Sequence, residues 1–271
     1  MNRLLVATDF SRRADIASTW AARHARATGR TLVLYHAIAI QGPGHPAVEV
    51  HRKSVTEWLE QQSKQAETVT AAALRAAVPG VEILTEVEVA DDRAQGIRDA
   101  ARRHGVQTIV VGSRGENAVS RAVLGSVAAA MVTDAPCDVI VVPKHARHRG
   151  IDQALLLSDL EDLDADLAAL ARCVGETRPK LAIAHLRNPG TPAPDIDPAA
   201  RARAAGWPGA THAELVSEDW LDAVDEAVAD VGADLVAMAV RPHGLLHRIF
   251  RRDLVHAVAF QSLVPVAALR V

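Results

Sequence analysis

Hydrophobic and polar positions along the chain form two kinds of segment that alternate. Short apolar runs rich in β-branched residues, such as Thr108–Val111, predict buried strands. Alanine-rich stretches between capping residues, such as the one from Ser11 to Gly29, predict helices. In the first half the predicted strands are 3–8, 31–38, 81–89, 107–112 and 138–143, and the predicted helices are 12–28, 47–77, 92–104 and 126–134. Strands that alternate with helices indicate an α/β fold built on parallel sheets.

The second half of the chain repeats the pattern of the first. Its apolar runs correspond to strands of the first half as follows: 155–160 to 5–10, 181–186 to 32–37, 234–238 to 107–111, and 264–269 to 137–142. This correspondence puts Asp159 at the place of Asp9. A polar, basic linker, Lys144–Gly150, separates the halves, so we expect two domains, 1–145 and 151–271.

A glycine-rich connection after one predicted strand is the most informative chemical feature. Gly112-Ser113-Arg114-Gly115 follows the strand, and nine residues later Gly125-Ser126 opens an alanine-rich helix. Glycine has no Cβ to obstruct an oxyanion, and a helix N-terminus adds a favourable partial charge, so such a connection can bind phosphate. The spacing fits neither the Walker A nor the dinucleotide-binding pattern. An ordinary strand-to-helix connection that needs flexible residues is the alternative.

Three features together resemble the universal stress protein family, and the repeat in the second half adds a resemblance to its tandem two-domain form. They are the turn Thr8-Asp9-Phe10-Ser11, the strand ending in Tyr35-His36-Ala37, and the G-x2-G-x9-G-S spacing. The resemblance covers Met1 to about Lys144. It implies two doubly wound domains, Rossmann-like and similar to the adenine nucleotide alpha hydrolases, each with a five-stranded parallel sheet flanked by helices. Their strand order would be 3-2-1-4-5, which brings Asp9 and Gly112 to one crevice where the winding reverses.

The same resemblance implies that ATP or AMP binds in the first domain. The nucleotide-binding residues it implies are Ala7, Thr8, Asp9, Ala37, Val111, Gly112, Ser113, Arg114, Gly115, Gly125, Ser126 and Val127. The glycines and Ser126 would offer backbone N–H groups to phosphate, and Ala7, Thr8 and Ala37 would surround adenine. Asp9 would lie near the ribose or a nucleotide-bound Mg²⁺, or cap the first helix. Arg114 and Arg121 would close over the phosphates, and His36 is expected to cap a strand end. Ala128 departs from the family, many of whose members have threonine there.

The second half has lost the phosphate landmarks. Ala239, Pro242, Arg252 and Asp253 stand where the first half has Gly112, Gly115, Gly125 and Ser126. Proline has no N–H to donate, and Asp253 adds a negative charge, so we expect one nucleotide per chain. A cluster of basic residues follows, and it consists of Arg241, His243, His247, Arg248, Arg251, Arg252 and His256. It predicts a solvated or partner-facing helix, with an anion or nucleic-acid surface as the alternative; zinc would need a third ligand.

Composition narrows the setting of the protein. The 271 residues are 49% hydrophobic but only 3% aromatic, so the core must be aliphatic. A net charge of −3 gives no global attraction to nucleic acid or an anionic membrane. Cys137 and Cys173 lack metal-binding spacing, which indicates reduced thiols. No apolar run approaches the roughly 20 residues that cross a bilayer. With the first strand so near the N-terminus, we expect a soluble cytoplasmic protein.

Three classes of function compete. A regulatory stress protein that binds adenine nucleotide is favoured by the first-half glycines. A slow ATPase or phosphotransferase would need a general base or a nucleophile–base pair, and neither is evident. A partner-binding module would leave the glycines as relics. The apolar strands 137–142 and 264–269 are expected to pair inside the chain, and a homodimer of such chains is the alternative.

Overall fold

The computed structural model describes residues 2–39, 46–113, 124–146, 150–187, 189–190, 195–217, 219–241 and 252–271. The strands of the first half are β1 (Arg3–Ala7), β2 (Thr31–Ala39), β3 (Ile83–Ala90), β4 (Thr108–Gly112) and β5 (Asp138–Val142). Its helices are α1 (Arg12–Ala27), α2 (Pro46–Ala77), α3 (Arg93–His104) and α4 (Ser126–Asp134). These bounds confirm the predicted alternation of strands and helices to within a few residues.

The second half follows the same sequence of elements. Its strands are β6 (Gln153–Ser158), β7 (Lys180–Arg187), β8 (Thr211–Val216), β9 (Leu235–Val240) and β10 (Val266–Arg270). Its helices are α5 (Leu163–Val174), α6 (Pro198–Ala204), α7 (Trp220–Val231) and α9 (Arg252–Gln261), with a 3-10 turn at Gly175–Thr177. The short α6 lies where the first half has the long α2, because prolines and glycines interrupt this part of the sequence.

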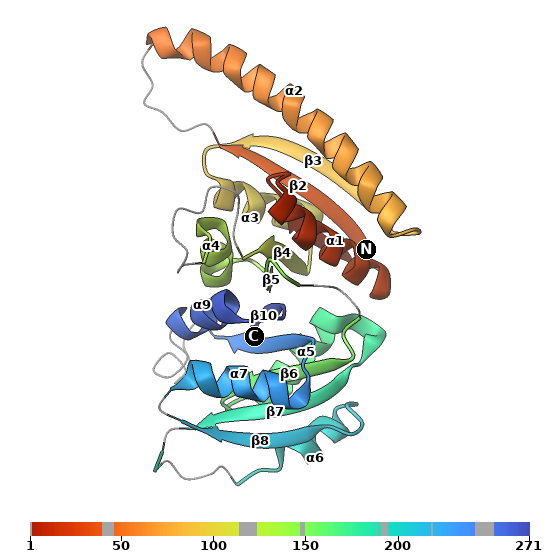
Figure 1. The fold of residues 1–271 in the computed structure, drawn as a ribbon, viewed down its shortest axis with the longest axis vertical. Helices are drawn as coiled ribbons and strands as arrows, with labels where there is room; N and C mark the ends of the chain where they lie inside the picture. Colours follow the sequence, from red (N-terminus) through yellow and green to blue (C-terminus); the bar gives the residue numbers. More distant parts are fainter. Residues whose placement is uncertain are drawn as a thin grey trace.

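All of these strands belong to one 10-stranded sheet, in the order β3-β2-β1-β4-β5-β10-β9-β6-β7-β8. Each half therefore has the 3-2-1-4-5 order, and the strands within each half are parallel. Helices α1, α2, α5 and α6 bury apolar residues against one face of the sheet, and α3, α4, α7 and α9 against the other (Figure 1). This arrangement confirms the α/β fold with a doubly wound, Rossmann-like topology.

Strands β5 and β10 join the two halves, and they are the one antiparallel pair among the strand pairs described. Val266 lies opposite Val141, and Ala268 lies opposite Val139. These side chains are small and fully buried, so the helices on both faces can approach the sheet closely across the junction. The sheet therefore continues from one half into the other without an exposed strand edge between them.

A buried carboxylate fastens this junction. Asp138, at the start of β5, has a fully buried side chain. Its oxygens accept hydrogen bonds from Arg172 Nε and Nη2 of α5, at 3.2 and 3.1 Å. They also accept the backbone N–H of Arg270 in β10, at 2.8 Å. The Arg172 side chain donates in addition to the Arg270 carbonyl at 2.8 Å, so one ion pair links β5, α5 and β10.

The junction extends to the helices on one face. Buried Arg30, which follows α1, donates to Thr108 Oγ1 at 3.2 Å and to the backbone carbonyl of Arg172. A ring nitrogen of His24 lies 3.2 Å from the Cys173 carbonyl. Burial raises the pKa of the Cys137 and Cys173 thiols to about 12, so both stay protonated at neutral pH, in agreement with the expected reduced state.

Replacing Arg172 by methionine removes the cation from the junction and leaves the Asp138 carboxylate buried. Because Arg172 is 40% exposed and the Arg270 N–H still donates, we expect the free energy of unfolding to fall by about 2–3 kcal/mol. Urea titration followed by circular dichroism measures this change. The control is Arg201→Met, which breaks an ion pair with Asp164 whose side chains are more than half exposed, and its expected cost is below about 1 kcal/mol. Equal losses in the two variants would contradict the role of Asp138.

Candidate functional site

The carboxyl ends of β1 and β4 lie side by side in the first half. Leu4 pairs with Thr108 and Val6 with Val110, so both strands end at the same edge of the sheet. The connections of β1 and β4 lead to opposite faces of the sheet at this point, because β1 continues into α1 and β4 into α4. Such a reversal of winding leaves a crevice outside the strand ends, where open α/β sheets bind ligands.

The turn after β1 holds Asp9 at this crevice. The N–H of Thr8 donates to the Tyr35 carbonyl at 2.9 Å, and Thr8 Oγ1 accepts the N–H of Phe10 at 3.0 Å. Asp9 Oδ1 accepts the N–H of Ser11 at 3.1 Å, and the Asp9 side chain is exposed. Phe10 has a φ of 57°, an uncommon value for a residue with a side chain. The local hydrogen bonds therefore impose a tight turn that presents the Asp9 carboxylate to solvent.

Ser11 caps the first helix, as the sequence predicts. Its hydroxyl accepts the N–H of Ala14 at 3.2 Å. Asp9 lies outside the helix and forms a turn with Ser11 instead. The helix cap and the carboxylate at the crevice thus belong to two different residues.

His36 supports the same turn from the neighbouring strand. Its Nδ1 donates to the Thr8 carbonyl at 2.7 Å, and its ring contacts the ring of Phe10 with centroids 4.8 Å apart. Burial lowers the pKa of His36, although the hydrogen bond to Thr8 opposes this change. The neutral ring therefore has a structural role at the strand end, as the sequence analysis expects.

The glycine-rich connection begins at the end of β4 and returns at the start of α4. The N–H of Ser113 donates to the Val142 carbonyl, and the N–H of Gly125 donates to the Ser113 carbonyl, both at 2.9 Å. The N–H of Gly125 is thus used within the connection, which differs from the expected role as a phosphate donor. Gly125 is the N-cap of α4 and supplies no side-chain cap, so the first N–H groups of the helix, from Ser126 onward, have no partner within the helix.

Apolar side chains of the crevice meet on one face of the sheet. Ala7, Ala37, Val111 and Val127 belong to the same apolar cluster, although they come from β1, β2, β4 and α4. Ala37 and Val111 are buried, whereas Ala7 and Val127 are partly exposed. Arg114, Gly115 and Arg121, which the sequence analysis assigned to the phosphates, lie outside the described residues.

The second half builds the same turn at the same place. The N–H of Leu160 donates to Ser158 Oγ at 3.0 Å, and Asp159 Oδ1 accepts the N–H of Glu161 at 3.1 Å. Leu160 has a φ of 65°, like Phe10 in the first half. Ala154 pairs with Leu235 as Leu4 pairs with Thr108, so the register puts Ala239 at the position of Gly112.

An arginine side chain occupies this second crevice. Arg241, directly after β9, has its Nη1 3.3 Å from Asp159 Oδ1, and its Nη2 donates to Asp166 and to the Asp162 carbonyl. Ser158 Oγ donates to the other Asp166 oxygen at 2.6 Å. The Arg241 side chain is only 12% exposed. The sequence predicts a solvated or partner-facing position for Arg241, whereas its guanidinium turns inward because the carboxylates of Asp159 and Asp166 attract it.

Burial dominates the electrostatics of this closed crevice. It raises the pKa of Asp159 to about 6 and also raises the pKa of Asp166, although Arg241 opposes both changes. Of the other basic residues in the cluster, His243, His247, Arg248 and Arg251 lie outside the described residues. His256 Nε2 lies 3.1 Å from Thr133 Oγ1, a contact between α9 and α4.

Within the described residues, no group of three or more His, Cys, Asp or Glu side chains could hold a metal ion. Over the same part of the chain, no helix is long and apolar enough to cross a membrane.

Known proteins with similar sequences match about half of the chain. A relative from Staphylococcus haemolyticus, named as a universal stress protein, is 33% identical over 140 residues, 51% of this chain and 82% of the relative. A universal stress protein of Mycolicibacterium smegmatis is 31% identical over 154 residues, or 56% of this chain. This chain spans only 49% of the length of the mycobacterial protein in that match.

Solved structures extend the likeness of the fold to the whole chain. A universal stress protein from Archaeoglobus fulgidus covers 99% of this chain with a TM-score of 0.71, at 19% sequence identity. Another protein of that name from the same organism, solved in complex with dAMP, covers 52% of this chain with a TM-score of 0.38.

The sequence profile described as the universal stress protein family matches residues 1–143, more than half of the chain. That span contains the crevice formed by β1, β4 and the start of α4. The chain therefore belongs to the universal stress protein family.

Proposed function

We propose that the first half of this chain is a regulatory unit that binds one adenine nucleotide, ATP or AMP, and that the second half binds none. The observation that carries the proposal is the contrast between the two crevices. The same turn presents an exposed carboxylate, Asp9, in the first half and one that is only 11% exposed, Asp159, in the second. Arg241 neutralises Asp159 from within the second half, whereas in the first half β4, the neighbour of β1, leads to a helix N-terminus without a side-chain cap.

The start of α4 has the chemistry of a phosphate site. Its first N–H groups lack partners within the helix, and the positive end of the helix dipole points to the same place. Gly112 and Gly125 have no positive φ, so the backbone conformation does not require glycine at either position. Space beside the backbone is the remaining reason for glycine, and a phosphate would use that space.

The other side of the crevice suits a base and a ribose. Ala7, Ala37 and Val111 form a small-residue surface at the ends of three neighbouring strands, which leaves room for a planar ring. Thr8 is held by backbone hydrogen bonds and lines the same end of β1. Asp9 would face the ribose hydroxyls or a Mg²⁺ ion carried by the phosphates, since carboxylate oxygens suit both.

A binding role is favoured over catalysis. Among the described residues at this crevice, His36 is neutral and hydrogen-bonded to the Thr8 carbonyl, and Asp9 already accepts the N–H of Ser11. We therefore propose that nucleotide occupancy, rather than turnover, is the signal this unit reports.

The two halves act as two units, 1–145 and 151–271, in this proposal. Their final strands pair as β5 and β10, so the chain forms an internal pseudo-dimer and leaves no such edge for a second copy. The second unit then has a structural or partner-binding role.

Valine in place of Gly125 tests the phosphate site. The backbone there has φ −58° and ψ 147°, which valine adopts readily, so the fold should be unchanged. Its side chain would fill the space beside the start of α4 and displace phosphate. Losing two charge-assisted hydrogen bonds at about 1.5–3 kcal/mol each weakens binding by roughly 100-fold or more. Isothermal titration with ATP measures the affinity.

The control for this variant is Ala135→Val, at the other end of the same helix. Ala135 is the C-cap and has extended backbone geometry, φ −99° and ψ 150°, so valine fits there too. We expect its ATP affinity to be that of the unchanged protein. Wild-type affinity in a folded Gly125→Val variant would rule out phosphate at the α4 N-terminus.

Methionine in place of Arg241 tests the closed crevice. Removing the guanidinium should raise the pKa of Asp159 above its value of about 6, because the nearest positive charge is lost. The destabilisation is expected to be about 3–5 kcal/mol at pH 8, where the carboxylates are charged and unpaired. It should shrink as pH falls from 8 towards 6, through the raised pKa of Asp159 in the variant, because the folded variant then binds the proton that neutralises this carboxylate.

Carbon-detected NMR of the Asp159 carboxyl group measures this pKa, and urea unfolding at pH 5 and pH 8 measures the free energy. Arg187→Met is the matched control, since Arg187 pairs with Glu214 at the sheet edge. An Asp159 pKa that stays unchanged or falls in Arg241→Met would contradict the proposed ion pair.

A further inference from the structure

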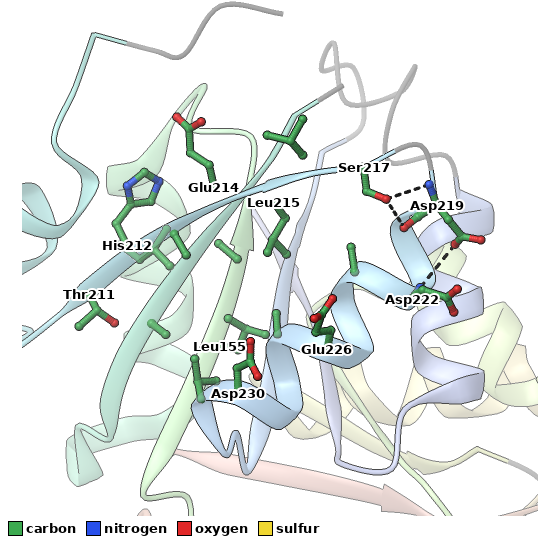
Figure 2. Close-up of a pocket in the computed structure, with 18 residues that line it drawn as sticks. Leu155, Thr211, His212, Glu214, Leu215, Ser217, Asp219, Asp222, Glu226 and Asp230 are labelled. Atoms are coloured by element: carbon green, nitrogen blue, oxygen red, sulfur yellow. Dashed lines mark hydrogen bonds between the residues drawn. The ribbon is translucent and has the colours of Figure 1, made fainter. Parts of the chain in front are cut away.

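A cavity of about 470 Å³ lies between α7 and the strands β7 and β8 of the second half (Figure 2). It is distant in the topology from the nucleotide crevice, because β7 and β8 form the far end of the sheet. Its volume is within the range of sites for small molecules, roughly 300–1,000 Å³. Neither the family profile, which ends at residue 143, nor the proposed function accounts for it.

The register of the strands explains why the cavity exists. Ala154 pairs with Leu181 as Leu4 pairs with Leu32, so Ala184 has the position that Tyr35 has in the first half. Tyr35 is fully buried, and its hydroxyl donates to Glu88 at 2.9 Å. Ala184 lacks this ring, and the second half therefore leaves open the space that Tyr35 fills.

The charge on the neighbouring helix also differs in sign between the Tyr35 position of the first half and the cavity of the second half. In the first half, Arg103 of α3 pairs with Glu86 and Glu88 of β3. Helix α3 ends at the left-handed glycine Gly105, and helix α7 ends at the equivalent glycine Gly232. Asp230 and Arg103 each lie two residues before this glycine, so Asp230 has the position in α7 that Arg103 has in α3. The helix beside the cavity is thus acidic where its counterpart is basic.

Three carboxylates line the cavity along one helix. Asp222, Glu226 and Asp230 of α7 follow at intervals of four residues, about 6 Å apart along the helix axis. Figure 2 shows Glu226 and Asp230 on the side of α7 that faces β8 and Leu155. Among the described residues that line the cavity there is no Lys or Arg, and no described cation pairs with these carboxylates.

The rest of the lining is mainly apolar, although Thr211, His212 and Glu214 of β8 also line the cavity. Leu155, Ala182 and Ala184 form the sheet side of the cavity, and Leu215 and Ala227 close it from β8 and α7. Two further polar groups are already used: Asp219 accepts the N–H groups of Leu221 and Asp222 as the N-cap of α7, and its own N–H donates to Ser217. The cavity thus combines a row of negative charges with an apolar floor.

We propose that this cavity binds a linear aliphatic diamine or polyamine. Its ammonium groups would pair with successive carboxylates of α7, and the methylene chain between them would lie on Leu155 and Leu215. A nucleotide or other anion is excluded by charge, so this site is separate from the first crevice. A single metal ion is a poor fit, because no group of three or more His, Cys, Asp or Glu side chains among the described residues could hold one.

Isothermal titration of the full chain with spermidine tests the proposal, at low ionic strength and with ATP absent. The double variant Glu226→Gln/Asp230→Asn keeps the side-chain volumes and removes two charges, and should bind at least tenfold more weakly. The matched control, Asp225→Asn/Glu176→Gln, removes two exposed charges outside the cavity and should stay within twofold of the unchanged protein.

A second variant, Ala184→Tyr, restores the ring that fills the first half and should abolish spermidine binding. Equal weakening in the control pair would overturn the proposal, because it would show attraction to general surface charge only. Unchanged affinity in a folded Ala184→Tyr variant would place spermidine outside the cavity and overturn it as well. If Mg²⁺ displaces spermidine at a concentration equal to that of spermidine, the carboxylates would be assigned to a metal ion. This result would also overturn the proposal.

Discussion

The antiparallel pairing of β5 with β10 is the interaction on which the rest of the structure depends. It converts two parallel arrangements into one 10-stranded sheet, so neither half exposes its last strand. Asp138 fixes the pairing through Arg172 and the backbone of Arg270, and Arg30 ties in the helix layer of the first half. The two halves meet through equivalent strands and have the same strand order. The crevice of the first half can therefore be compared with that of the second half residue by residue.

That comparison shows that the same turn can lie beside an uncapped helix N-terminus in one half and beside an arginine side chain in the other. A threonine or serine, an aspartate and a residue of positive φ form the same turn after β1 and after β6. In the first half the turn lies beside Gly112 and an uncapped helix. In the second it lies beside Ala239 and Arg241, whose guanidinium supplies internally the positive charge that the buried carboxylates require. The second half has an ion pair at this place, while the local hydrogen bonds and the positive φ of the turn are the same in both halves.

Much of the fold could be predicted from the sequence, because β-branched runs, capping residues and glycines act locally. Ser11, Gly29 and Gly105 mark helix ends through their own backbone chemistry. Features that depend on distant partners were harder to predict. The hydrogen bond from Gly125 to Ser113 closes a connection between elements, and the inward turn of Arg241 depends on Asp166, 75 residues earlier. The cavity beside α7 follows from aligning Ala184 with Tyr35, which needs the strand register. The nucleotide-binding roles of Gly112, Ser126 and Asp9 stay predictions.

The stoichiometry of ATP binding to the full chain tests the central claim most directly, namely that the first crevice is open and the second is closed by its own arginine. Titration calorimetry should give one nucleotide per chain, and a crystal grown with a non-hydrolysable ATP analogue should show it beside Asp9 and the start of α4. Two nucleotides per chain, or density for the analogue beside Asp159 with the Arg241 side chain displaced, would contradict the account.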